Sequence, residues 1–203
     1  MPTFDIIMTT WNRKDYTKRT VASLLQSGAY DKCERFIVVD NGSVENGMQD
    51  FLNVLSGYHK TWVLRRPKND GWATSVNDAL GCSRSEYILL INNDVEFDEG
   101  FVDKMFESFT HQVDIGILGA WHHTSHSFVG ISTPWFKEMD NVPAVCWLMS
   151  KWAMEKVGML HEKGVCLTKG GNGEDTEYVN MMKAQGLLVG VTASDVVHHI
   201  DGY

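Results

Sequence analysis

Short apolar runs alternate along the first half of the chain with segments whose apolar residues recur at helical spacing. The runs at 4–8, 35–39 and 87–91 have the length and composition of buried strands. Between the first two runs, residues 17–26 carry apolar side chains three and four positions apart, which predicts a helix. Alternation of this kind predicts an α/β fold with a mostly parallel central sheet flanked by helices.

The rest of the chain continues this scheme less regularly. Residues 122–134 are rich in Ser, His and Thr and are predicted to form a long loop, and 169–173 a glycine-rich loop. We expect one domain over 1–203, with a nucleotide-type half at 1–94 and a mixed half at 95–203. The further predicted elements are helices at 48–55, 74–81, 99–109, 151–157 and 174–185, and strands at 62–64, 115–120, 144–149, 188–191 and 196–198.

Composition excludes several classes of protein. With 43% hydrophobic and 22% charged residues among 203, the chain has the balance of a globular protein and not of a disordered one. A net charge of −8 argues against a broad surface for nucleic acid, because phosphate binding requires many cations. No apolar run approaches the roughly 20 residues that span a bilayer. The first residues lack a basic leader followed by an apolar stretch, so we expect a cytoplasmic protein.

Cysteine and histidine spacing gives no zinc signature. The four cysteines are scattered without a Cys-x-x-Cys pair, so we expect reduced thiols with a structural role. His122, His123 and His126 could suggest a metal cluster, but they lie in a polar segment with no carboxylate nearby.

Polar residues follow the predicted strands at the points where these end. Right-handed crossovers bring the carboxyl ends of parallel strands to one edge of a sheet, so Thr10, Asp40 and the segment 92–94 are expected to meet there. No glycine fingerprint or P-loop follows the first strand, so a nucleotide must be held another way. Trp11 could stack on a pyrimidine while Asp40 accepts its imide N–H. The alternative is that 40–42 is only a turn.

Asn92-Asn93-Asp94 offers two amides and a carboxylate directly after the strongest strand. Oxygen ligands of this kind suit Mg²⁺ or Mn²⁺ bridging a diphosphate, although a turn or helix cap would explain the same residues. A cation there would neutralise the charge that builds on a diphosphate leaving group. His198 or His199, after the last predicted strand, could complete the coordination sphere, but such a pair can also be structural.

Glu174-Asp175 opens the last long predicted helix. Backbone N–H groups and the helix dipole stabilise carboxylates at such a position, so an acidic N-cap explains the pair. A carboxylate held at a rigid helix start could also act as a general base.

Taken in order, these motifs resemble those of family 2 glycosyltransferases of the GT-A fold, over essentially the whole chain. Each motif is short, but their order along the chain is specific. The matching segments are Thr10-Trp11-Asn12-Arg13, Val39 to Ser43, Asn69-Asp70-Gly71 followed by Asn77, Asn92-Asn93-Asp94, Val145 to Glu162, Glu174-Asp175, and His198 or His199. The Asn92-Asn93-Asp94 variant of the family's Asp-x-Asp motif is similar to that of rhamnosyltransferase-like members.

The resemblance implies an inverting, metal-dependent transfer of a sugar from a UDP- or dTDP-type donor to a hydroxyl acceptor, expected to be a saccharide. Asp175 would take the acceptor's proton, while Glu174 orients the acceptor or the catalytic loop. Asp94 would hold Mn²⁺ or Mg²⁺ with His199 or His198. Because the first Asp of the motif is absent, the metal is expected to depend on the bound donor.

The resemblance makes 1–94 the nucleotide-sugar-binding half and 95–203 the acceptor-binding and catalytic half. It also implies a set of donor contacts. Asp40 would read the base and Trp11 pack on it, while Asp70 and Asn93 contact the ribose or the donor sugar. The full set of expected nucleotide-sugar-binding residues is Thr10, Trp11, Asn12, Arg13, Asp40, Asn69, Asp70, Gly71, Asn77, Asn92 and Asn93.

Two other functions fit parts of the same pattern. A catalytically silent sugar-nucleotide-binding module would share the fold, but Glu174 and Asp175 beside Asp94 count against it. A glycosyltransferase acting on modified DNA bases is disfavoured by the net charge of −8. The oligomeric state and the donor sugar stay open.

Overall fold

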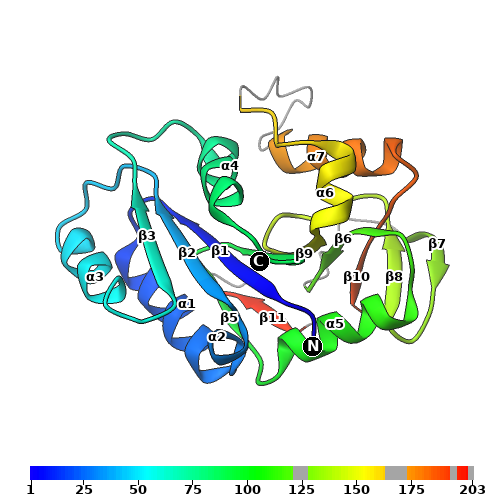
Figure 1. Ribbon diagram of the computed structural model, residues 1–203, viewed down its shortest axis with the longest axis horizontal. Helices are drawn as coiled ribbons and strands as arrows, with labels where there is room; N and C mark the ends of the chain where they lie inside the picture. Colours follow the sequence, from blue (N-terminus) through cyan, green and yellow to red (C-terminus); the bar gives the residue numbers. More distant parts are fainter. Residues whose placement is uncertain (121–127, 163–172, 193–195, 201–203) are drawn as a thin grey trace.

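The structure is a computed structural model that describes residues 1–120, 128–162, 173–192 and 196–200. Its centre is a nine-stranded sheet in the order β3-β2-β1-β4-β9-β6-β10-β8-β7 (Figure 1). The strands are β1 Phe4–Thr10, β2 Arg35–Asp40, β3 Thr61–Arg65, β4 Tyr87–Ile91, β6 Ile115–Gly119, β7 Phe128–Ser132, β8 Phe136–Met139, β9 Cys146–Ser150 and β10 Leu188–Thr192.

The sheet is mostly parallel, as predicted. Strands β3, β2, β1 and β4 pair in parallel, and so do β6 and β10. Strand β9 is antiparallel to β4 and β6, and β8 is antiparallel to β10 and β7. Among the described strands of this sheet, only β8 and β9 therefore run against the common direction, and the sheet continues through both predicted halves of the chain.

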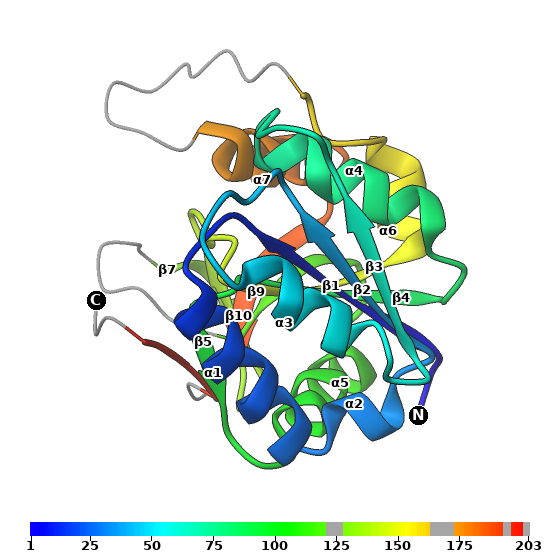
Figure 2. The same cartoon turned by 90° about the vertical axis from the view of Figure 1, so that its left-hand side faces the viewer.

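Helices cover both faces of the sheet, as Figure 2 shows. Helices α1, α2, α3 and α5 pack on one face, and α4, α6 and α7 on the other. The alternation within β1 explains why two cores form: Ile6 and Met8 point into the first, and Ile7 into the second. The helices are α1 Lys14–Gln26, α2 Ala29–Lys32, α3 Met48–Leu55, α4 Trp72–Cys82, α5 Phe101–His111, α6 Lys151–Val157 and α7 Gly173–Ala184.

The prediction of a long loop at 122–134 is wrong for its second part, because residues 128–132 form the edge strand β7. Strand β8 was also not predicted. Both strands are short; they pair with each other, and β8 also pairs with β10, which is distant in sequence. The histidines at 122, 123 and 126, Cys166, and the predicted loop residues 169–172 lie outside the described residues.

A second, two-stranded sheet joins β5 Val95–Phe97 to β11 Val197–His199. The sequence did not indicate β5, because three residues are too few to show the alternation of apolar and polar side chains that marks a strand. The pairing is antiparallel and sets His199 opposite Val95 and His198 opposite Glu96. It therefore brings the end of the described chain beside Asp94.

The carboxyl ends of the parallel strands meet at one edge, as predicted. Thr10 pairs with Asp40, and Met8 with Ile91, so the residues that follow β1, β2 and β4 are neighbours. In the part of the chain that the structure describes, no helix is both long and apolar enough to cross a membrane.

Candidate active site

The loop after β1 is tied to the loop after β2 by Asn12. Its backbone N–H donates to Ser43 Oγ at 2.7 Å, and its Oδ1 accepts from the N–H groups of Val44 and Glu45 at 2.9 and 3.1 Å. Asn12 itself has φ of 56°, a left-handed conformation that asparagine tolerates better than most residues. Asn12 was predicted to contact the nucleotide sugar, but its side-chain oxygen is used for hydrogen bonds that hold the loop after β2.

Asp40 ends β2 and is 1% exposed. Its Oδ1 accepts from Ser43 N at 3.0 Å and its Oδ2 from Gln49 Nε2 at 2.7 Å. Each carboxylate oxygen has a second lone pair, so Asp40 keeps the capacity to accept one more hydrogen bond. Trp11, on the neighbouring loop, is 53% exposed and offers an aromatic face at this edge.

The loop before α4 crosses directly over the loop after β2. Gly42 has φ of +73°, and a Cβ there would lie 2.4 Å from the backbone carbon of Lys68. Asn41 Nδ2 then donates to Asn69 Oδ1 at 2.8 Å and to the Gly71 carbonyl at 3.0 Å. The backbone of Asn69 to Gly71 is therefore held by Asn41, a residue that the sequence had marked only as part of a motif.

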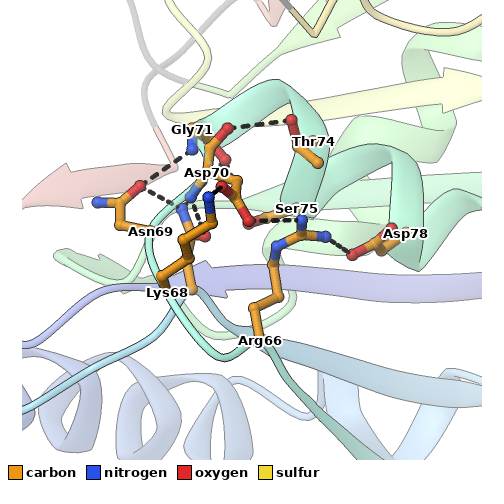
Figure 3. A network of polar contacts seen from close by, with 9 residues as sticks. Arg66, Lys68, Asn69, Asp70, Gly71, Thr74, Ser75 and Asp78 are labelled. Atoms are coloured by element: carbon orange, nitrogen blue, oxygen red, sulfur yellow. Dashed lines mark hydrogen bonds and ion pairs between the residues drawn. The ribbon is translucent and has the colours of Figure 1, made fainter.

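Asp70 lies between two cations, as Figure 3 shows. Its carboxylate pairs with Arg66 Nη2 at 3.0 Å and with Lys68 Nζ at 3.1 Å, and Arg66 also pairs with Asp78. Hydrogen bonds from Arg66 and then Lys68 lower the pKa of Asp70, and the bond to Asp70 in turn raises the pKa of Arg66. Asp70 is therefore an ionised group, held at the start of α4.

The amide of Asn93 joins three elements. Its Nδ2 donates to Thr10 Oγ1 at 3.1 Å and to Thr17 Oγ1 at 3.0 Å, and the two hydroxyls lie 3.0 Å apart. This cluster fixes the end of β4 against β1 and α1. Thr10 and Asn93, both expected at the donor, are thus brought together with their side chains bonded to each other.

Asn77 lies elsewhere. Its amide exchanges two hydrogen bonds with the backbone of Leu160, at 2.8 and 3.1 Å, and it is 8% exposed. It does not line the pocket described below. Asn77 thus fastens α4 to the segment after α6, and we do not carry it into the proposed site.

Asp94 carries the features expected of a metal ligand. Its Oδ2 lies 3.3 Å from Arg13 Nη1 and 3.6 Å from His199 Nε2. Its Oδ1 is buried and has no hydrogen-bond partner among the described residues. A buried carboxylate oxygen without a donor is costly unless something positive occupies the position beside it.

Strand alternation separates the two histidines. His199 turns toward Asp94, while His198 Nε2 contacts Asp98 Oδ1 at 3.0 Å on the exposed side of β11. The side chain of His199 is 14% exposed and that of His198 58%. Of the two candidates that the sequence left open, only His199 adjoins Asp94.

A pocket of about 370 Å³ contains several of the predicted residues. Glu174 and Asp175 enter it from the first turn of α7, and His199 and Asn92 from the side of Asp94. Its lining is Trp72, Asn92, Pro143, Ala144, Val145, Glu174, Asp175 and His199. The predicted base Asp175 thus lines one cavity with the predicted metal ligand His199 and with Asn92, which precedes Asp175 by about 80 residues in sequence.

Glu174 and Asp175 differ in what they contact. Glu174 Oε2 accepts from the Ala73 N–H at 3.3 Å, so it caps the first turn of α4 from across the pocket. Asp175 Oδ1 accepts from the Thr176 N–H at 2.7 Å, and the side chain borders the pocket. The pair therefore includes one carboxylate that bridges two helices and one that faces the cavity.

Trp72 is a pocket residue that the sequence reasoning missed. Its ring meets the edge of the buried Trp147 at 6.2 Å between centroids, with an interplanar angle of 83°. Trp72 follows Gly71 in a recognised motif, but nothing in the spacing showed that it would face Asp175. That placement depends on the packing of α4 against β9.

A divalent cation fits this site. Asp94 supplies an unpartnered carboxylate oxygen, the ligand type that suits Mn²⁺ or Mg²⁺, and His199 adds an imidazole nitrogen beside it. In the described residues no group of three or more His, Cys, Asp or Glu side chains could hold a metal. A cation bound by Asp94 and His199 alone would therefore need oxygen ligands from a bound diphosphate.

The profile of the family described as "Glycosyl transferase family 2" matches residues 5–157. This covers more than half of the chain. The chain belongs to this family of glycosyltransferases. The match extends from β1 to the end of α6 and includes the loops described above.

Two curated relatives align over part of the chain. Protein CgeD of Bacillus subtilis (strain 168) is 28% identical over 112 residues, which make up 53% of this chain and 26% of CgeD. The uncharacterized protein y4gI of Sinorhizobium fredii is 34% identical over 96 residues, 47% of this chain and 10% of that protein. The aligned parts are thus about a quarter or less of these relatives.

Solved structures of glycosyltransferases share the fold. The mannosyltransferase PcManGT of Pyrobaculum calidifontis, in complex with GDP-Man and Mn²⁺, superposes with a TM-score of 0.70 at 14% identity, covering 95% of this chain and 57% of that one. GalNAc-T7 with UDP, GalNAc and Mn²⁺ gives a TM-score of 0.79 at 10% identity, covering 98% and 44%. The predicted GT-A fold is confirmed, whereas the similarity to rhamnosyltransferase-like members stays a prediction.

Proposed function

We propose that this glycosyltransferase moves a sugar with inversion from a UDP- or dTDP-sugar to a hydroxyl of a saccharide. The observation that carries the proposal is the pocket that Asp175 shares with His199, the neighbour of Asp94. A general base and a site for the diphosphate then lie on either side of one cavity, as a single displacement requires.

In this proposal Asp94 and His199 hold the cation, whose chemistry is to neutralise the charge that develops on the leaving diphosphate. Asp175 accepts the proton of the acceptor hydroxyl. The oxygen of that hydroxyl forms a bond to the anomeric carbon on the face opposite the diphosphate, and the bond to the diphosphate breaks with its electron pair. Glu174, through its bond to Ala73, keeps the first turns of α7 and α4 together around the reacting groups.

For the donor base, the proposal rests on Asp40 and Trp11. A carboxylate that can accept one more hydrogen bond matches the imide N–H of uracil or thymine, and cytosine offers an acceptor at that position. The exposed ring of Trp11 provides a stacking face. We expect UDP and dTDP to bind more tightly than CDP, and Asp40→Ala to remove that preference at a cost of roughly 1–3 kcal/mol.

For the acceptor, the support is the apolar side of the pocket. Trp72 and the strip 143–145 offer an aromatic face and aliphatic surface beside Asp175. Such a lining suits the C–H face of a pyranose ring while the carboxylate contacts a hydroxyl.

The deciding experiment is transfer from a panel of nucleotide sugars to a panel of saccharides, followed by Asp175→Asn. Asparagine keeps the shape but cannot take a proton, so turnover should fall about 10²- to 10⁴-fold. UDP affinity should stay within a few fold, and Asp31→Asn, at an exposed position of α2, should change neither. Near wild-type turnover in Asp175→Asn, with an unchanged melting temperature, would reject the assignment of the base.

A further inference from the structure

The carboxylate of Asp175 is held on one side only. Its Oδ1 accepts the Thr176 N–H at 2.7 Å and lies 3.4 Å from Thr176 Oγ1. Within the described residues, Oδ2 has no hydrogen-bond partner. The two oxygens of the proposed base are therefore not equivalent.

The Thr176 hydroxyl is itself oriented by Asn141. Asn141 Nδ2 donates to Thr176 Oγ1 at 3.2 Å. The Asn141 N–H occupies one lone pair of Thr176 Oγ1. The single hydroxyl proton of Thr176 can therefore point to Asp175 Oδ1. Two hydrogen bonds in series thus run from the loop between β8 and β9 to the base.

The loop that carries Asn141 is anchored to the same helix. Lys183, in the last turn of α7, donates from Nζ to the carbonyls of Met139 and Asp140, at 2.9 and 2.5 Å. The backbone beside Asn141 is therefore fixed relative to α7, and Asn141 can act as a rigid support for the first turn of the helix.

We propose that Asn141 and Thr176 are positioning residues, which hold Asp175 Oδ1 so that Oδ2 receives the acceptor proton. This inference rests on the proposed function of Asp175 as the base. The proton passes from the acceptor hydroxyl to Oδ2, the acceptor oxygen bonds to the anomeric carbon, and the diphosphate leaves with the electron pair of the broken bond. Two donors on Oδ1 fix the rotation of the carboxylate, which keeps Oδ2 aimed at the acceptor.

Thr176→Val removes the hydroxyl and keeps the shape of the side chain. The expected result is a fall in kcat of about 2- to 10-fold, which corresponds to the loss of one long hydrogen bond, with the KM values for donor and acceptor unchanged. Thr176→Ser keeps the hydroxyl and should retain most of the turnover. Thr110→Val, on the exposed side of α5, is the control for a threonine in a helix. Equal turnover in Thr176→Val and Thr176→Ser would overturn the proposal.

Asn141→Leu tests the second hydrogen bond. Leucine has a similar shape but no donor, so the Thr176 hydroxyl loses its orientation, and kcat should fall several fold with KM unchanged. Asn180→Leu, at an exposed position of α7, is the matched control and should have wild-type kcat. Wild-type kcat in Asn141→Leu would remove Asn141 from the proposal.

A double-mutant cycle separates this inference from the proposed function. If Thr176 acts through Asp175, adding Thr176→Val to Asp175→Asn should lower the residual rate no further. Additive losses would overturn the positioning role. If instead Asp175→Asn is itself fully active, the proposed base fails, whereas an inactive Asp175→Asn beside a fully active Thr176→Val leaves the base in place and rejects only the positioning role.

Discussion

At the scale of single residues, the polar side chains at the active edge of the sheet divide into two groups. Asn12 uses its amide to join two loops, and Asn93 uses its amide to join the end of β4 to β1 and α1. His199 and Asp175 instead line the pocket, and Asp94, beside His199, keeps a carboxylate oxygen without a partner among the described residues. Because the first group holds the loops in place, the second can be positioned before any ligand arrives.

The two adjacent histidines provide a residue-scale prediction with a built-in control. His199→Ala should reduce the gain in UDP affinity on adding Mn²⁺ by at least about tenfold. Loss of a residue that only hydrogen-bonds a metal ligand already lowers metal affinity by about tenfold or more, and His199 is proposed as a ligand itself. His198→Ala removes a side chain that contacts Asp98 and should leave the gain intact. Isothermal titration of UDP with and without Mn²⁺ measures both, and a larger loss in His198→Ala would contradict the assignment.

At the scale of elements, the site is built where two loops cross. The loop after β2 passes beneath the loop before α4, and the contact is so close that residue 42 has no room for a side chain. Asn41 then bonds both Asn69 and Gly71. The Asp40 side of the site and the start of α4 are therefore joined by direct contacts.

Gly42→Ala should break this crossing. The substitution combines a left-handed φ with a Cβ placed against the Lys68 backbone, so a loss of about 2–4 kcal/mol in unfolding free energy is expected. Gly28→Ala is the matched control, because Gly28 has φ of +79° but no atom within 4 Å of the added Cβ. Gly28→Ala should lower the unfolding free energy only by the cost of a left-handed backbone for alanine, about 1–2 kcal/mol. Urea unfolding measures both, and equal losses would show that the crossing does not constrain residue 42.

At the scale of the whole molecule, an ion pair at the opposite edge of the sheet joins distant segments. Asp5 is fully buried; it pairs with Arg35 at 3.1 Å and accepts from Ser83 Oγ at 2.6 Å and from Arg84 N at 3.1 Å. Burial alone would raise the pKa of Asp5, but these hydrogen bonds outweigh it and lower the pKa below the ordinary value. The start of β1 is thereby fastened to β2 and to the end of α4.

This lowered pKa predicts how global stability depends on pH. A carboxyl whose pKa is lower in the folded state contributes stability above its unfolded pKa of about 3.9, and that contribution is lost as pH falls through the folded value. Asp5→Asn should therefore cost about 3 kcal/mol at pH 7, and the difference from wild type should shrink below about pH 4. Asp31→Asn, at an exposed position, is the control for denaturant unfolding at each pH. A difference that stays constant down to pH 2 would contradict the assignment.

Much of the architecture follows from local pattern. The runs that became β1, β2 and β4 are apolar and short, and the segments between them have helical spacing, so a parallel sheet covered by helices could be predicted. Parallel strands with right-handed crossovers must bring Thr10, Asp40 and Asn92 to one edge, whatever the rest of the chain does. The same motifs, taken in order, were sufficient to predict the family.

Only the tertiary structure decided which atoms face a ligand. In a strand, adjacent side chains point to opposite sides, so the pairing of β11 with β5 was needed to distinguish His199 from His198. The packing of α4 directed Asn77 toward Leu160 and Trp72 toward the pocket. Strand β8 is likewise stabilised by pairing with β10, which is distant along the chain, and β7 by pairing with β8. Sequence determines where a polar residue stands on its element, but its direction depends on contacts between elements far apart in the chain.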